Sequence, residues 1–271
     1  MAGQEAKDTK SATDYRAQRL DKLAQLKALG VDPYAGGFVP GARAAELDAK
    51  YKDLAAGAET PDRVNVAGRI RALRNSGMFI DLHDATGKIQ VFCHKDSLAP
   101  ASLAVLKLLD LGDLIGVEGV VRRTPRGELT VNARALTVLA KALLPLPEKF
   151  HGLTDVETRY RQRYLDLIMS EESRQTLRRR SQIIAVMRRL LIERGYLEVE
   201  TPMLHTIPGG ASAKPFVTHH NALDLELYQR IAPELHLKRL LVGGLSDKLF
   251  EINRNFRNEG ISPRHNPEFT S

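Results

Sequence analysis

Residues 64–92 read VNVAGRIRALRNSGMFIDLHDATGKIQVF, and this stretch decides the fold of the first half of the chain. Short runs of β-branched and apolar residues predict strands at 64–73, 78–83 and 88–92. Between the last two runs, Asp84-Ala85-Thr86-Gly87 has the composition of a hairpin turn. The stretch therefore predicts the beginning of a β-sheet domain.

The residues that follow extend this domain to about residue 140. The pattern predicts two more strands, at 116–122 and 129–138, and a helix at 98–109 between the third strand and the fourth. Five strands with a helix after the third are the order of an OB-fold β-barrel. Such barrels bind single-stranded nucleic acid by stacking its bases on exposed aromatic side chains. We therefore expect a nucleic-acid-binding OB-fold domain over residues 64–140.

Three side chains of this expected barrel are suited to reading a base. Phe79, Gln90 and Glu128 fall on the second, third and fifth strands, where they could converge on one face of the sheet. Phe79 offers a stacking surface, and the other two offer hydrogen-bonding groups. An apolar ring on a strand is equally consistent with the core, so both interpretations of Phe79 stay open.

The flanking segments are predicted to be less compact. Residues 1–63 contain expected helices at 14–29 and 42–56 that are rich in Ala, Lys and Asp, and we interpret them as a helical N-terminal extension with a solvated surface. Residues 141–156 are interpreted as an interdomain linker, because prolines interrupt their first part.

Residues 157–271 have a different pattern, in which short strands alternate with helices. Strands joined by hairpins around one helix indicate an antiparallel sheet, so the whole chain is expected to be of α+β class. The expected helices are at 171–194 and 233–241, and the expected strands are at 196–201, 216–218, 223–229 and 248–256.

Composition excludes several classes of protein. Of 271 residues, 40 are Lys or Arg and 33 are Asp or Glu, and the net charge of +7 favours an anionic partner. Cys93 is the single cysteine, which excludes an internal disulfide framework and fits a reducing compartment, so we expect a cytoplasmic location. No apolar run is long enough to span a membrane. Neither a P-loop nor a G-x-G-x-x-G motif is present.

The final segment concentrates the side chains that a nucleoside triphosphate site requires. Residues 250–260 read FEINRNFRNEG, and 264–270 read RHNPEFT. Arginine can neutralise a phosphate, histidine can donate to another, glutamate can accept from the adenine amino group, and phenylalanine can stack. On spacing alone, a hairpin with ordinary surface charges is about as probable as such a site.

The same two segments resemble the second signature motif of class II aminoacyl-tRNA synthetases, and their residues are most similar to those of the bacterial-type lysyl-tRNA synthetase family. The resemblance covers about residues 14–271, and it is also carried by residues 161–167, 198–202, 208–211, 218–224 and 231–235. It implies ATP-dependent activation of lysine to lysyl-adenylate and transfer to the 3′ end of tRNA(Lys). Within the class, aspartyl- and asparaginyl-tRNA synthetases share the architecture but match these segments less well.

The resemblance also implies roles for individual residues in ATP binding. Arg257 would be the catalytic residue, bridging the α-phosphate and the lysine carboxylate. Glu259 would read the adenine amino group, and Phe269 would stack on adenine. His265 and Asn266 would bind the outer phosphate and the adenosine.

Further roles concern lysine and the tRNA. Gly210 and Glu234 would hold the α-amino group of lysine, together with Arg257. Phe79, Gln90 and Glu128 match positions that contact anticodon bases in this family, with Arg69 nearby. The region ending at Pro202 would form a homodimer interface.

The resemblance stops part-way through the family pattern. The third motif, the acidic ligands of Mg²⁺ and the pocket for the lysine ammonium are expected beyond Ser271, so no metal ligand is assigned within this chain. The 271-residue chain is therefore expected to be a catalytically incompetent fragment. A binding module for the tRNA anticodon, without catalysis, is the alternative function for the chain as given. A lysine ligase acting on a translation factor lacks the barrel, which argues against that alternative.

Overall fold

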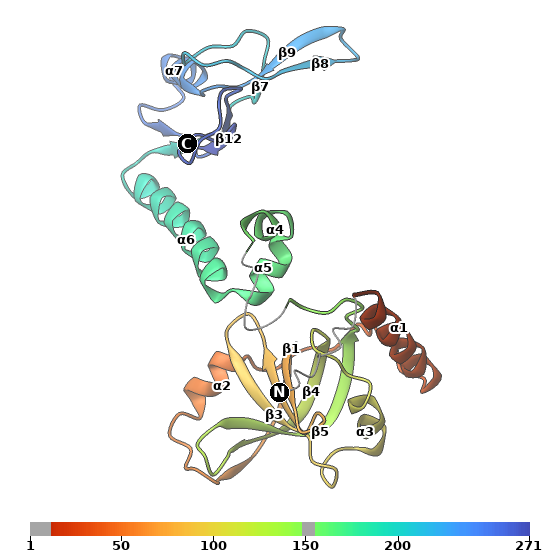
Figure 1. Ribbon diagram of the computed structural model, residues 1–271. Helices are drawn as coiled ribbons and strands as arrows, with labels where there is room; N and C mark the ends of the chain where they lie inside the picture. The colour runs from red at the N-terminus through yellow and green to blue at the C-terminus, as the bar shows by residue number, and fades with distance from the viewer. Residues whose placement is uncertain (1–11, 148–154) are drawn as a thin grey trace, which may run out of the picture. The chain divides into compact units, whose positions relative to one another are not determined.

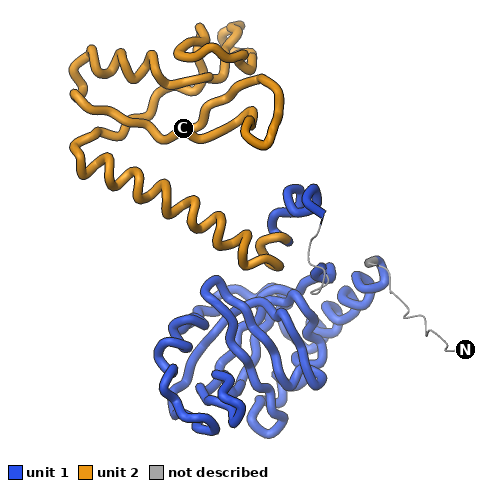
Figure 2. The backbone as a smooth tube through the Cα atoms, turned by 60° about the vertical axis from the view of Figure 1, so that its left-hand side comes forward, with its two compact units in different colours: residues 1–165 blue, residues 166–271 orange. Residues whose placement is uncertain are grey.

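The computed structural model describes residues 12–147 and 155–271. The chain divides into two compact units, residues 1–165 and 166–271 (Figure 2). Within the described residues, no helix is both long enough and apolar enough to cross a membrane.

A closed five-stranded barrel forms the centre of the first unit (Figure 1). Its strand order is β1-β2-β3-β5-β4, with β3 and β5 parallel and the other neighbours antiparallel. Helix α3 (Pro100–Leu106) lies between β3 and β4 in the sequence, which confirms the expected OB-fold order. The strands are β1 (Glu59–Arg74), β2 (Phe79–His83), β3 (Lys88–Phe92), β4 (Leu114–Arg123) and β5 (Leu129–Ala140).

The alternation of side chains along β2 and β3 separates the core of the barrel from its outer face. Ile80 and Leu82 on β2, and Ile89 and Val91 on β3, are buried in the hydrophobic core. Because successive side chains of a strand point to opposite faces, their neighbours in the sequence lie on the outer face of the sheet. This geometry places Phe79 outside the core.

The N-terminal helices share the core of the barrel, which differs from the expected solvated extension. Helix α1 (Ala12–Ala28) and helix α2 (Ala44–Lys50) contribute Leu26 and Leu47, both almost fully buried, to that core. In the segment that connects the two helices, the Phe38 ring packs on Gly116, and a Cβ added to this glycine would lie only 2.6 Å from the ring. Each helix is polar on most of its surface, and its composition therefore does not indicate that a narrow apolar face packs on the barrel.

The first residue of the predicted linker belongs to the barrel unit. The Lys141 ammonium is fully buried and lies 2.5 Å from Asp110 Oδ2 and 2.8 Å from Asp113 Oδ2. It also donates to the Leu108 carbonyl at 2.9 Å. The linker prediction also includes residues 148–154, which lie outside the described residues.

The second unit contains three small sheets. The sheet with order β7-β9-β8 and the pair β11-β12 are antiparallel, as expected, whereas β6 and β10 pair in parallel. The expected strand at 248–256 is divided into β10 and β11, and β7 was not predicted. The helices that follow residue 155 are α4 (Val156–Arg161), α5 (Arg163–Met169), α6 (Glu171–Glu193) and α7 (Glu234–Val242). Of these, α4 belongs to the first unit, and the boundary between the units falls within α5. The strands are β6 (Leu197–Glu198), β7 (Leu204–His205), β8 (Val217–His220), β9 (Leu225–Gln229), β10 (Leu249–Phe250), β11 (Arg254–Phe256) and β12 (Glu268–Thr270).

A buried ion pair joins these small sheets. Arg230 Nη1 lies 2.6 Å from Glu251 Oε1, and both side chains are about 1% exposed. Arg230 Nε donates to the Arg254 carbonyl at 2.7 Å, and Thr201 Oγ1 donates to Glu251 at 2.7 Å. Burial alone would raise the pKa of Glu251, but the hydrogen bonds from Arg230 and Thr201 and the arginine charge hold that pKa below its ordinary value. The pair therefore fixes β11, which ends directly before Arg257.

Candidate nucleic-acid interface and adenylation site

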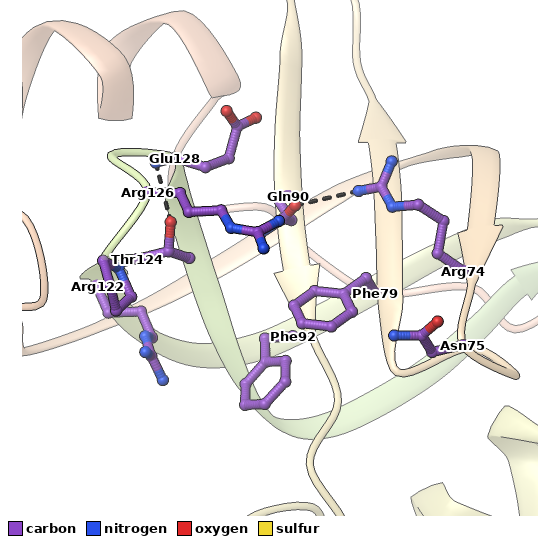
Figure 3. A pocket seen from close by; sticks show the side chains of 10 residues that line it. Arg74, Asn75, Phe79, Gln90, Phe92, Arg122, Thr124, Arg126 and Glu128 are labelled. Carbon is purple, nitrogen blue, oxygen red and sulfur yellow. Dashed lines mark hydrogen bonds between the residues drawn. The ribbon is translucent and has the colours of Figure 1, made fainter.

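A pocket opens on the outer face of the barrel, above β2 and β3 (Figure 3). Its volume is about 650 Å³, and it combines two aromatic rings with several basic side chains. The residues that line it are Arg74, Asn75, Phe79, Gln90, Phe92, Arg122, Thr124, Pro125, Arg126 and Glu128. A surface with aromatic faces and positive charge is what single-stranded nucleic acid requires.

The aromatic part of the pocket is built from two adjacent strands. Phe79 on β2 faces Phe92 on β3 in the register, and their ring centroids are 4.9 Å apart with an angle of 36° between the planes. The Arg122 guanidinium lies over the Phe92 ring, 5.5 Å from its centroid. Phe79 is partly exposed, whereas its neighbour Ile80 is fully buried. The structure therefore favours the surface interpretation of Phe79 over the core interpretation.

Polar side chains beside the rings form one connected network. Arg74 Nη1 and Nη2 donate to the two carboxylate oxygens of Asp81 at 3.0 and 2.7 Å. Arg74 Nη2 also donates to Gln90 Oε1 at 3.1 Å, and Gln90 Nε2 donates to Thr130 Oγ1 at 2.9 Å. Glu128, directly before β5, is exposed and lies 3.0 Å from the Lys88 ammonium. These contacts place hydrogen-bonding groups around the aromatic rings.

Arg69 does not line this pocket. Its guanidinium donates to the Gly112 carbonyl at 2.7 Å, beside the turn that leads into β4. Burial lowers the pKa of Arg69, and the charge of Asp113 opposes this effect. The structure therefore brings Phe79, Gln90 and Glu128 together and leaves Arg69 apart from them.

Seven of the residues that line the pocket were missed by sequence reasoning, and four of them carry a charge or an aromatic ring: Arg74, Phe92, Arg122 and Arg126. Strand periodicity could have found Phe92, because it follows Gln90 by two positions and so shares its face. Arg74 faces Phe79 across the β1–β2 pair, but a register of this kind is visible only in the structure. Arg122 lies near the end of β4 and Arg126 lies within the turn that follows, and the sequence does not specify the direction of this turn.

In the second unit, Gly210 and Glu234 lie against each other. A Cβ added to Gly210 would lie 3.3 Å from the Glu234 Cβ and 3.4 Å from the Ala232 Cβ. Gly210 also has a φ of +88°, which favours glycine. Glu234 begins α7, is exposed, and lies 2.5 Å from the Lys238 ammonium.

Arg257 and Glu259 each contact a segment that adjoins Gly210 or Glu234 in the sequence. Arg257 Nε donates to the Ile231 carbonyl at 3.4 Å, close to the start of α7, and its guanidinium carbon lies 5.1 Å from the Phe269 ring centroid. Glu259 Oε1 accepts from the Lys214 backbone N–H at 3.3 Å. The structure therefore gathers Arg257, Glu259 and Phe269 near the loop that carries Gly210.

His265 and Asn266 are in an exposed turn between β11 and β12. His265 Nδ1 lies 2.7 Å from Ser262 Oγ, and the two residues form an isolated β-bridge. No contact joins these two side chains to Arg257 among the described interactions. Over residues 12–147 and 155–271, no group of three or more His, Cys, Asp or Glu side chains is arranged to hold a metal ion.

Comparisons with known proteins assign a family to two regions of the chain. Residues 64–139 match the family of OB-fold nucleic acid binding domains, and residues 155–271 match the class II tRNA synthetases of the D, K and N group. The chain is 59% identical over 259 residues to a lysine–tRNA ligase of Sinorhizobium medicae, an alignment that covers 96% of this chain and 51% of the relative. The chain is a homologue of the class II lysine–tRNA ligases.

More distant lysine–tRNA ligases align over a similar extent. The relative from Rhizobium johnstonii is 54% identical over 272 residues, covering 100% of this chain and 54% of the relative. The relative from Nostoc punctiforme is 53% identical over 271 residues, covering 96% of this chain and 48% of the relative. The chain thus spans about half the length of the curated lysine–tRNA ligases it matches, corresponding to their N-terminal portion.

Proposed function

We propose that this chain supplies the anticodon-binding barrel and part of the adenylation site of a lysine–tRNA ligase. The complete reaction would activate lysine with ATP to lysyl-adenylate and transfer the lysyl group to the 3′ end of tRNA(Lys). The observation that carries the proposal is the pocket that unites Phe79, Gln90 and Glu128 on the barrel surface. We also propose the domain division into residues 1–63, 64–140, 141–156 and 157–271, in which the helices of the first segment pack on the barrel and Lys141 is anchored in it.

The pocket is proposed to bind an anticodon base. Phe79 supplies a ring face on which the base stacks, and Gln90 and Glu128 supply hydrogen-bonding groups for its edge. Arg122 and Arg126 contribute positive charge that attracts the RNA backbone. Arg69, which the resemblance also associated with the anticodon, lies outside the pocket and is proposed to support it only indirectly.

In the adenylation site, the chemistry depends on positioning and charge. The lysine carboxylate oxygen would form a bond to the α-phosphorus of ATP while the bond to the leaving pyrophosphate breaks. Arg257 would stabilise charge that develops on the α-phosphate. Glu234 and Gly210 would hold the lysine α-amino group, Glu259 and Phe269 the adenine, and His265 and Asn266 the outer phosphate and the adenosine.

Magnesium would screen the charge of the triphosphate when it is bound. The described residues do not offer a cluster of ligands that fits this ion, so we derive no step through it. Its ligands, like the pocket for the lysine ammonium, are proposed to lie outside residues 1–271.

We further propose a cytoplasmic homodimer whose interface includes the region ending at Pro202. The exposed apolar side chains Ile183, Met187 and Leu190 on α6 support such an interface.

Two assays on the 271-residue chain test this proposal. We expect the chain to bind an anticodon stem-loop of lysine tRNA in a filter-binding assay and to show no lysine-dependent pyrophosphate exchange. Binding without exchange also fits the alternative of an anticodon-binding module, and exchange by a protein that extends beyond residue 271 would then favour the ligase. Robust exchange by the 271 residues alone would show that essential residues are assigned to the wrong half.

A further inference from the structure

The polar network beside the pocket fixes the orientation of the Gln90 side-chain amide. A guanidinium carries only donors, so the Gln90 atom that faces Arg74 at 3.1 Å has to be the oxygen Oε1. Thr130 Oγ1 has a single hydrogen, which it donates to the Glu128 carbonyl at 3.2 Å. Thr130 can therefore only accept from Gln90, and the group that faces it has to be the amide nitrogen.

Asp81 holds Arg74, the arginine that faces Gln90 Oε1, in place. The Arg74 side chain is 49% exposed and has many rotamers in isolation, so a single bond to Gln90 would order it poorly. Asp81 binds both terminal nitrogens of Arg74, and the Asp81 side chain is only 11% exposed. This bidentate pair fixes the guanidinium plane and so fixes which amide atom it contacts.

We propose that Asp81 and Thr130 are positioning residues that make the pocket discriminate uracil from cytosine. The inference rests on the proposed anticodon function. Gln90 retains one Oε1 lone pair and one Nε2 hydrogen, which form an adjacent acceptor and donor. For a base stacked on Phe79, the fixed amide therefore offers the acceptor Oε1 and the donor Nε2 at fixed positions along the base edge. Uracil presents an acceptor at position 4 and a donor at position 3, whereas cytosine presents the reverse.

An amide that turns over by 180° would read the opposite base equally well. The locked orientation removes this second state, so discrimination depends on residues that need not contact the RNA. Asp81→Asn weakens the bidentate pair that holds Arg74 against Gln90 and leaves the shape of the side chain unchanged. Thr130→Val removes the acceptor from the opposite side and is isosteric, which suits a residue with no exposed surface.

The test measures affinities of the 271-residue chain for two anticodon stem-loops that differ only by U or C at the central anticodon position. We expect wild type to prefer U by roughly tenfold or more, in line with the worth of one bidentate base contact. Asp81→Asn and Thr130→Val should each reduce this ratio to below about threefold, and Thr130→Ser, which keeps the hydroxyl, should restore it. Asp53→Asn, which removes an exposed carboxylate elsewhere in the same unit, is the matched control.

The outcomes separate the inference from the function on which it rests. If Asp81→Asn and Thr130→Val leave the wild-type ratio of U to C affinities unchanged, the positioning role is overturned but anticodon binding is retained. Equal affinity of wild type for both stem-loops overturns it as well, and failure of wild type to bind either overturns the proposed function. Melting temperatures identify a variant that does not fold, and Asp81→Asn then decides alone, because its change in shape is the smaller.

Discussion

Replacing Phe79 by alanine separates a role in RNA binding from a role in the core. The ring is partly exposed, lines the pocket and contacts Phe92 at a centroid distance of 4.9 Å. Losing one base stacked on an aromatic ring costs about 1 to 3 kcal/mol, which is roughly a 5- to 150-fold loss of affinity. We expect a loss in this range for an anticodon stem-loop.

The same substitution should affect stability only modestly. Phe79 lies outside the core cluster, so the main loss is the contact with Phe92, worth about 0.5 to 1.5 kcal/mol. Ile80→Ala is the matched control, because Ile80 is the next residue on the same strand and has no exposed surface. It should lower the free energy of unfolding by about 2 to 5 kcal/mol.

Two measurements on both variants decide the matter: stem-loop affinity by fluorescence anisotropy, and unfolding in urea. Phe79→Ala should lose affinity and retain most of its stability, whereas Ile80→Ala should lose stability. Our reasoning about the pocket would be refuted if Phe79→Ala bound RNA within about twofold of wild type, or if its loss of stability equalled that of Ile80→Ala.

Three further predictions concern the second unit and the core. In a protein extended to the full length of its relatives, Arg257→Ala should reduce lysine-dependent pyrophosphate exchange about a hundredfold or more with tRNA binding retained, and near-normal exchange would remove Arg257 from this role. Glu251 has a lowered pKa, so its stabilising contribution is present above its ordinary value of 4.5 and is lost as pH falls further. Glu251→Gln should therefore cost about 3 kcal/mol of unfolding free energy at neutral pH and progressively less as the pH falls below 4.5, and a difference that does not diminish in acid would contradict the assignment. Burial raises the pKa of Cys93 to about 12, so iodoacetamide at pH 8 should alkylate it only after unfolding, and rapid labelling of the native chain would disprove its burial.

The barrel was predictable from the sequence because its signals are local. Alternation and turn residues placed all five strands, and the helix after the third strand identified the topology. The packing of the N-terminal helices was not predictable, because Leu26 and Leu47 lie on narrow apolar faces of helices that are otherwise polar. The parallel pairing of β6 with β10 joins segments about fifty residues apart, and no local pattern specifies it.

The candidate sites were predictable in part for the same reason. Phe79 and Gln90 could be placed on a common face from the period of a strand. The network of Arg74, Asp81 and Thr130 depends on the register between strands, which the sequence alone does not reveal. Arg69 was assigned to the anticodon by resemblance, and its bond to Gly112 is a feature of the barrel end that only coordinates show.

The central claim, that this pocket receives an anticodon base, is tested most directly by crosslinking. An anticodon stem-loop of lysine tRNA carrying 4-thiouridine at the central anticodon position would be irradiated with the 271-residue chain, and the adducts mapped by mass spectrometry. We predict adducts on residues that line the pocket, principally Phe79, Phe92 or Gln90. Adducts confined to other parts of the chain, with the pocket residues unmodified, would contradict the claim.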